Sequence, residues 1–260
     1  MTENKNNQSS AAKRGLKLDG LRNEIRDSVK VFAEKLVAEL GDNLESITVV
    51  GSSLTDDFVA SQSDINTVLV LGKQTLDSLN TLAGMAKSMS KKKLAAPLLM
   101  TKDYLERSRD VFGIEFLDLQ LIHKTVLGED PFEKLSFAKS DIRLQCEREL
   151  KATLIRLRQG YIAAAANKKL VRDILASAGS GLVPLLRAML WLKDIERPNT
   201  AGPTLTKTAS EFSLNLDAVK TARSWRHQKM RLSENEIQTA FDNVYKTAEQ
   251  LANIVDKLEE

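Results

Sequence analysis

The chain has 260 residues, of which 42% are hydrophobic and 28% are charged, as is ordinary for a soluble globular protein of one or two domains. The net charge of +3 is too small to indicate nucleic-acid binding, and a single cysteine, Cys146, excludes an internal disulfide framework. The polar first ten residues contain no apolar segment of the kind found in secretory signals. We therefore predict a cytoplasmic protein with no membrane partner.

The first half of the chain mixes helical and strand-like patterns. A polar stretch over residues 1–15 predicts a disordered tail. The elements expected after it are a helix over 16–40, strands over 46–50 and 67–71, a helix over 76–89, an edge strand over 94–100 and a strand over 113–122. This mixture predicts an α/β domain over residues 16–132.

Strand patterns stop after the segment Gly-Glu-Asp-Pro-Phe at 128–132. The rest of the chain predicts helices over 133–166, 168–178, 182–195, 205–212, 215–230 and 233–258. The most apolar run, 182–192, is short for a membrane span and contains Arg187, so it predicts a buried helix. We therefore expect an all-helical domain over residues 133–260.

Polar residues stand where the first predicted strand ends and the second begins. Gly51 and Ser52 follow the first strand, and Asp64 and Asn66 open the second. Side chains two residues apart on a strand share a face, so Asp64 and Asn66 project together while Ile65 turns into the core. Two oxygen ligands suit a cation such as Mg²⁺, and a Gly-Ser turn can hold phosphate oxygens through backbone N–H groups. Together they indicate phosphoryl or nucleotidyl transfer.

This stretch resembles the signature of the DNA polymerase β-like nucleotidyltransferase superfamily. That signature is an apolar strand, Gly-Ser or Gly-Gly, a spacer of nine to thirteen residues, and Asp-x-Asp or Asp-x-Glu in a second strand. Here the spacer is residues 53–63, between Ser52 and Asp64. The resemblance covers about residues 20–135 well. It implies a mixed sheet with flanking helices, followed by a helical bundle.

The resemblance also implies a reaction and its site. A nucleoside monophosphate would pass from an NTP to a hydroxyl acceptor, with Mg²⁺ or Mn²⁺ as cofactor. The residues that would hold phosphates are Gly51, Ser52 and Ser53, and those that would hold the metal are Asp64, Asn66 and a third carboxylate from a later strand. The strand expected over 113–122 offers Glu115 or Asp118, which lie on opposite faces, so only one of them can serve.

Asn66 departs from the family pattern, because an amide oxygen can bind Mg²⁺ but brings no negative charge. Two hypotheses follow: a weak or one-metal enzyme, or a catalytically inactive module that binds a nucleotide or a partner. A third is nucleic-acid binding through the basic segment 223–231, which contains Trp225 and His227. The acceptor is left open between a small molecule, a protein and an RNA. His123 and Cys146 are interpreted as structural.

Overall fold

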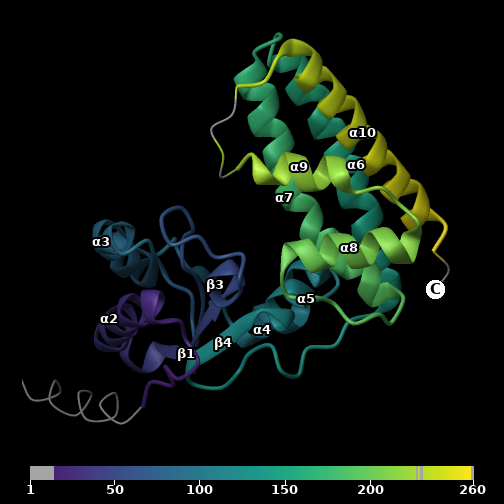
Figure 1. Ribbon diagram of the computed structural model, residues 1–260. Helices are drawn as coiled ribbons and strands as arrows, with labels where there is room; N and C mark the ends of the chain where they lie inside the picture. Colours follow the sequence, from purple (N-terminus) through teal and green to yellow (C-terminus); the bar gives the residue numbers. More distant parts are fainter. Residues whose placement is uncertain (1–14, 227, 229–230, 259–260) are drawn as a thin grey trace, which may run out of the picture. The chain divides into compact units, whose positions relative to one another are not determined.

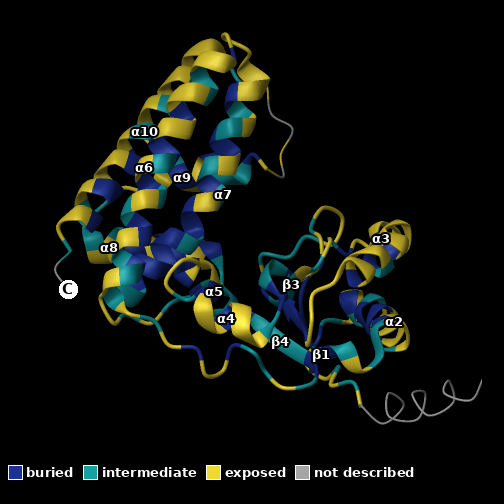
Figure 2. Ribbon diagram, turned by 180° about the vertical axis from the view of Figure 1, so that it is seen from behind, coloured by how far each residue is buried: buried dark blue, intermediate teal, exposed yellow. Residues whose placement is uncertain are grey.

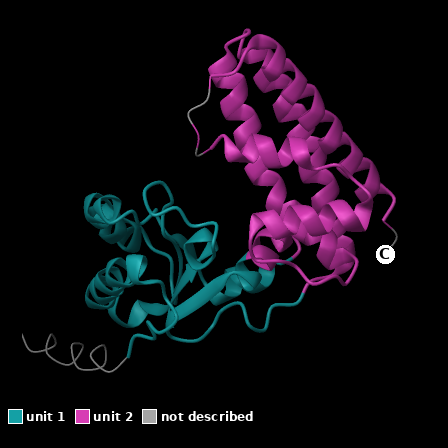
Figure 3. Cartoon of the chain, viewed as in Figure 1, with its two compact units in different colours: residues 1–109, 119–136 teal, residues 110–118, 137–260 magenta. Residues whose placement is uncertain are grey.

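The computed structural model describes residues 15–226, 228 and 231–258, so the predicted disordered tail lies, but for Gly15, outside the described residues. The chain forms two compact units (Figure 3). The first comprises residues 1–109 and 119–136, and the second comprises residues 110–118 and 137–260. The predicted division after residue 132 differs from this one by four residues at the main boundary and by the short segment 110–118.

The first unit contains a four-stranded mixed sheet with strand order β3-β2-β1-β4 (Figure 1). Its elements are α2 (Asn23–Leu40), η1 (Gly41–Asn43), β1 (Leu44–Val50), η2 (Gly51–Leu54), β2 (Asn66–Leu71), α3 (Leu76–Lys91), β3 (Leu98–Met100), α4 (Lys102–Arg107) and β4 (His123–Leu127). The central strand β1 is antiparallel to both β2 and β4, while β3 runs parallel to β2 at the edge. The mixed sheet and the edge position of β3 confirm the prediction.

One face of the sheet packs against helices. Ile47 and Val49 of β1 are fully buried in one cluster with Ile25 and Val29 of α2 and Met85 of α3. Alternate residues of a strand face opposite sides, so this packing fixes which side chains can reach the other face. The central strands β1 and β2 are largely buried, whereas β4 is partly exposed, and Figure 2 shows the outer sides of α2 and α3 as exposed.

The segment expected to be a strand over 113–122 is a helix, α5 (Gly113–Leu121), and the strand is instead β4 immediately after it. The prediction was wrong because the apolar residues of this segment fit both periods. Ile114, Leu117 and Leu121 follow helical steps, and the Gln145 side chain accepts a hydrogen bond from the Ile114 N–H at 3.1 Å at the start of the helix. Residues 113–118 belong to the second unit, and residues 119–121 to the first.

The second unit is helical beyond residue 137, as predicted. Its helices are α6 (Lys139–Ala163), α7 (Lys168–Leu192), α8 (Ala201–Phe212), α9 (Asp217–Ser224) and α10 (Glu234–Asp256). The break expected between 178 and 182 is absent, since α7 runs through it. A Cβ on Gly179 would lie 2.9 Å from the Arg223 backbone nitrogen, so this glycine lets α9 approach α7.

By length and composition, α7 could cross a membrane, with a mean hydropathy of 1.4 over its most apolar window. In the structure 61% of that window is buried within the protein. Leu182, Leu186 and Met189 pack in the core of the second unit. The helix therefore fits the predicted buried core helix.

Candidate functional site

The turn after β1 is shaped by a glycine. Gly51 has φ of +76°, a left-handed conformation that side chains disfavour. Its N–H donates to the carbonyl of Ile122 at 3.1 Å, which ties the turn to the start of β4. Within this turn Ser53 is fully buried, and its Oγ has no hydrogen-bond partner among the described residues. A buried hydroxyl without a partner is costly, so it marks the turn as a place that a ligand can complete.

Asn66 is the first residue of β2, and Asp64 lies just before the strand. Ile65 between them is 3% exposed and packs in the α2 and α3 cluster. Its N–H donates to the carbonyl of Lys93 at 2.7 Å, and its carbonyl accepts from Ala95 at 3.0 Å, so the backbone here is extended and anchored. The flanking side chains of Asp64 and Asn66 are both exposed. The predicted pairing of these two residues on one face follows from this alternation.

The Gly51 turn and the start of β2 meet in space. Val50 pairs with Asn66 across β1 and β2, and a Cβ built on Gly51 would lie 3.7 Å from Asn66 Nδ2. Neither Asp64 nor Asn66 forms a side-chain hydrogen bond or ion pair with another described residue. The structure therefore brings Gly51 and Asn66, with Asp64 next to them in sequence, together where β1 ends and β2 begins, and the side chains of Asp64 and Asn66 are exposed there.

His123 pairs with Val50 on the other side of β1 and is fixed by the protein itself. Its Nδ1 lies 3.0 Å from the Gln120 carbonyl, and its Nε2 lies 2.7 Å from Asp130 Oδ2. Both partners are acceptors, so each ring nitrogen has an acceptor within hydrogen-bond distance. Burial raises the pKa of Asp130, but hydrogen bonds from His123 and from the Phe132 N–H outweigh it and leave that pKa below its ordinary value. These contacts fit the structural role expected for His123.

Glu115 and Asp118 lie on α5 and belong to the second unit, not to a strand of the sheet. Three residues apart on a helix, they share a face, so the expectation of opposite faces is wrong as well. Asp118 Oδ1 lies 2.7 Å from Arg187 Nη1, whereas Glu115 is exposed. Strands β3 and β4 contain no carboxylate residue. A metal-binding role for either Glu115 or Asp118 stays a prediction.

The buried ion pair of Arg187 was not predicted from the sequence. The Arg187 side chain is 6% exposed, and besides Asp118 it donates to the carbonyls of Pro198 and Asn199, each at 3.0 Å. Arg197 adds a hydrogen bond to the Leu117 carbonyl at 2.9 Å, and burial lowers the pKa of Arg197. An arginine inside an apolar run was the available signal, because a buried guanidinium requires acceptors.

The aromatic residue of the predicted nucleic-acid-binding segment, Trp225, is not available to bases. Trp225 is 6% exposed and packs in the helical core of the second unit, so its ring is not open to stacking with bases. His227, Lys229 and Met230 of the basic segment lie outside the described residues.

The unpaired side-chain oxygens of Asp64 and Asn66 determine which metal ion could bind beside the Gly51 turn. Within the residues that the structure describes, no group of three His, Cys, Asp or Glu side chains could hold a metal ion. Asp64 and Asn66 offer one carboxylate and one amide oxygen, both of a type that Mg²⁺ accepts. The donor set fits a cation that completes its shell with water or phosphate oxygens, as Mg²⁺ usually does.

No protein-family model matches the sequence, and no curated protein matches it at a significant level. Among solved structures, the chain is similar to the spectinomycin adenyltransferase AAD(9) from Enterococcus faecialis, determined with ATP and spectinomycin. The similarity covers 86% of this chain and 98% of that one, with a TM-score of 0.55 and 11% identity. AAD(9) is a polymerase β-like nucleotidyltransferase. The chain therefore shares the fold of that structure, a mixed four-stranded sheet with helices followed by a helical region, as expected from the sequence.

Proposed function

We propose that the chain binds a nucleoside triphosphate at the Gly51 turn and transfers its nucleoside monophosphate to a hydroxyl group of a small molecule. The observation that carries this proposal is the meeting of the Gly51 turn with Asn66, beside Asp64, where β1 ends and β2 begins, with two side chains that have no partner among the described residues. Polar groups of a fixed backbone that have no partner in the protein are those that a ligand can use.

Each residue has a separate task in this proposal. The N–H groups of Ser52 and Ser53, at the start of a helical turn, donate to phosphate oxygens, and the buried Ser53 hydroxyl gains a partner. Asp64 and Asn66 would hold Mg²⁺ or Mn²⁺, which when bound neutralises phosphate charge and polarises the transferring phosphorus. The absence of a side chain on Gly51 keeps space beside Asn66 for the nucleotide.

The acceptor class rests on the similar structure. AAD(9) was determined with ATP and spectinomycin, a small molecule, and its length is covered almost completely by this chain. This favours ATP as donor and a small hydroxylated acceptor over a protein or an RNA, in agreement with the burial of Trp225.

Product formation tests the proposal directly. The full chain is incubated with each NTP, Mg²⁺ or Mn²⁺ and a panel of small polyols and aminocyclitols that includes spectinomycin, and pyrophosphate and acceptor mass are followed together. We expect pyrophosphate release that depends on one acceptor, together with a mass increase equal to one nucleoside monophosphate. Asp64→Asn is the matched variant and should show neither change.

A second function is a nucleotide-binding module without catalysis. Two observations favour it: residue 66 is an amide, and strands β3 and β4 contain no carboxylate that could add charge beside Asp64. Such a module would bind Mg²⁺–ATP and lose that binding in Asp64→Ala, but no acceptor would release pyrophosphate. Binding without turnover across the whole panel therefore selects this function over the first.

A further inference from the structure

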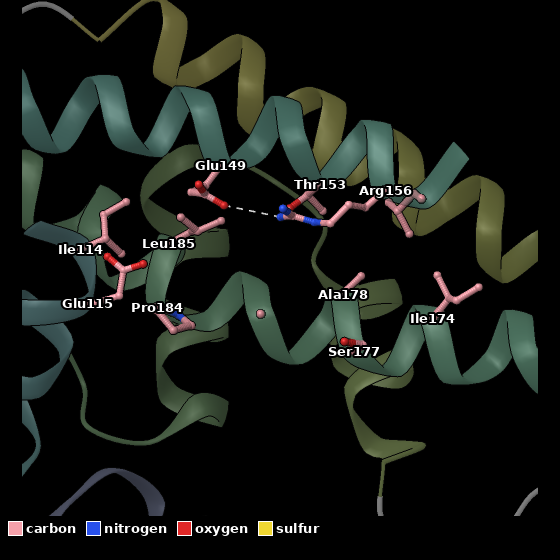
Figure 4. Close-up of a pocket in the computed structure, with 12 residues that line it drawn as sticks. Ile114, Glu115, Glu149, Thr153, Arg156, Ile174, Ser177, Ala178, Pro184 and Leu185 are labelled. Carbon is pink, nitrogen blue, oxygen red and sulfur yellow. Dashed lines mark hydrogen bonds and ion pairs between the residues drawn. The ribbon is translucent and has the colours of Figure 1, made fainter. Parts of the chain in front are cut away.

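A cavity of about 440 Å³ lies within the second unit among α5, α6 and α7 (Figure 4). Its base is apolar, because Leu157 of α6 and Leu185 of α7 are buried there, with Ile114 of α5 beside them. Its size falls in the range of small-molecule pockets, which combine an apolar surface with a few polar groups. The polar groups of this cavity come from all three helices.

The α7 wall is built from residues that a helix normally avoids. Ser177, Gly181 and Pro184 lie at steps of four and three, so they share the face that lines the cavity. Gly179 is explained by the close approach of α9, whereas a Cβ on Gly181 would meet no atom within 4 Å. Pro184 has no N–H, so the carbonyl of Ser180, four residues earlier, loses its helical donor. Nothing in the packing requires Gly181, and its effect is to widen the cavity.

The polar side chains that α6 contributes to the cavity form hydrogen bonds and ion pairs with other side chains of α6. Arg156 Nη2 lies 2.9 Å from Thr153 Oγ1 and 3.5 Å from Glu149 Oε2, and Glu149 also meets Arg148 at 3.5 Å. These groups hold one another, as the dashed line between Glu149 and Arg156 in Figure 4 indicates. Among the described residues, this wall therefore has no unpaired charged group.

Glu115 differs from these residues. It lines the cavity from α5, is exposed, and forms no hydrogen bond or ion pair with another residue that the structure describes. Its position is fixed, because the neighbouring Ile114 N–H donates to the side chain of Gln145, itself 5% exposed. The Glu115 carboxylate is therefore an acceptor at the cavity that has no partner among the described residues. It favours a ligand that donates a hydrogen bond.

We propose that this cavity binds a small organic cation, an ammonium group on an apolar body, with the ammonium at Glu115 and the body against Leu157 and Leu185. Glu149 is paired with arginines, whereas Glu115 is a charged lining group with no counterpart among the described residues, which favours a cation over an anion. The site is independent of the nucleotide function, and its test does not require turnover.

The test compares two ligands of nearly equal shape on the full chain: cyclohexylmethylamine, which is a cation at pH 7, and cyclohexylmethanol, which is neutral. Binding is followed by titration of the backbone amide signals of Ser177 and Gly181. We expect the amine to bind about tenfold more tightly than the alcohol, because a charge-assisted hydrogen bond to Glu115 forms only with the amine.

Two variants test separately the charge of Glu115 and the space beside Gly181. Glu115→Gln should bring the amine down to the affinity of the alcohol, whereas Glu24→Gln, which alters a glutamate in the first turn of α2, should leave the preference intact. Gly181→Leu should abolish binding of both ligands, while Gly202→Leu, at another helical glycine with open space around it, should change neither. Leucine favours a helix over glycine, so the Gly181 variant should stay folded, which circular dichroism verifies.

Each contrary result overturns the proposal. Equal affinity for amine and alcohol in the original chain would show that Glu115 serves only the start of α5. Unchanged binding in Gly181→Leu would place the ligands elsewhere, and no binding of the amine at millimolar concentration would show that the cavity does not take such cations.

Discussion

A buried charged group of the second unit and two exposed polar groups of the first unit are surrounded in opposite ways. In the second unit the deeply buried Arg187 is surrounded by acceptors from Asp118, Pro198 and Asn199. In the first unit Asp64 and Asn66 stand exposed and without partners among the described residues, on a backbone that is itself firmly hydrogen bonded. Saturated polar groups hold a fold together, whereas free polar groups on a rigid support are available to a ligand.

This contrast changes the interpretation of Asp118. The sequence made it a candidate metal ligand together with Asp64, but its carboxylate balances a buried guanidinium 2.7 Å away. A charge that is needed inside the protein is expected to affect stability when it is removed. The effect of removing Asp64 should fall on ligand binding instead.

The largest expected effect is on the stability of the second unit. Arg187→Met removes the guanidinium and takes a donor from Asp118 and from the Asn199 carbonyl, whereas the Pro198 carbonyl still has Thr204 Oγ1 within 3.2 Å. We expect a loss of about 3 kcal/mol in the free energy of unfolding, chiefly from the unpaired Asp118 carboxylate. Urea denaturation measures it. Asp64→Ala, an exposed residue of the first unit, should change stability by less than about 0.5 kcal/mol.

The double variant Arg187→Met with Asp118→Leu sharpens this prediction. If the cost comes from an unpaired buried carboxylate, the second substitution should restore part of the loss. Equal losses in the single and double variants would instead assign the effect to packing around residue 187.

The next largest effect is on metal and nucleotide binding beside the Gly51 turn. Asn66→Asp adds a negative charge beside Asp64, and we expect Mg²⁺–ATP to bind about tenfold more tightly, since even a well-solvated charge at a ligand position contributes about 1–2 kcal/mol. Calorimetry measures it, with the neutral variant Asn66→Ser as control. An unchanged affinity would mean that residue 66 is not a metal ligand.

A smaller effect concerns the pair that fixes the start of β4. Asp130→Asn weakens the contact with His123, and we expect a loss of about 1 kcal/mol at pH 7. The pKa of Asp130 is lower in the folded chain than its ordinary 3.8, so its contribution is present above pH 3.8 and is lost as the pH falls through the folded value. Urea curves should therefore separate the two proteins more at pH 7 than at pH 3.

The smallest expected effect concerns Cys146, whose thiol should not react in the folded protein. Burial raises the pKa of this thiol from 9.0 to about 12, with a further contribution from the charge of Glu115. In native protein at pH 8 we expect no labelling by a thiol reagent, and full labelling in urea. The same shift predicts that stability falls as the pH rises above 9, because only the unfolded chain releases the proton there. Rapid labelling of folded protein would contradict this burial.

Much of the first unit was predictable because its signals are local. The helix ending at Gly41, the strands around Gly51 and Ile65, and the spacing between Ser52 and Asp64 all follow from periodicity and from residues adjacent in sequence. The alternation that turns Ile65 inward also places Asp64 and Asn66 outward. These features indicated the fold correctly.

The predictions were wrong where contacts between residues far apart in sequence determine the local structure. The run over 113–122 satisfies both the helical and the strand period, and the contact that favours the helix comes from Gln145. Gly179 was taken as part of a helix break because the chain that needs its small size, around Arg223, lies more than forty residues later. Likewise, the partners of Arg187 are separated from it in sequence, so its role could not be deduced from its own neighbours.

The central claim is that Asp64 is free in the protein because it serves a bound nucleotide. Calorimetric titration of Mg²⁺–ATP into the original chain, Asp64→Ala and the control Asp77→Ala, which removes an exposed carboxylate on α3, tests it most directly. We predict that Asp64→Ala weakens binding at least about tenfold while Asp77→Ala leaves it unchanged. Equal affinities for all three proteins would contradict the account.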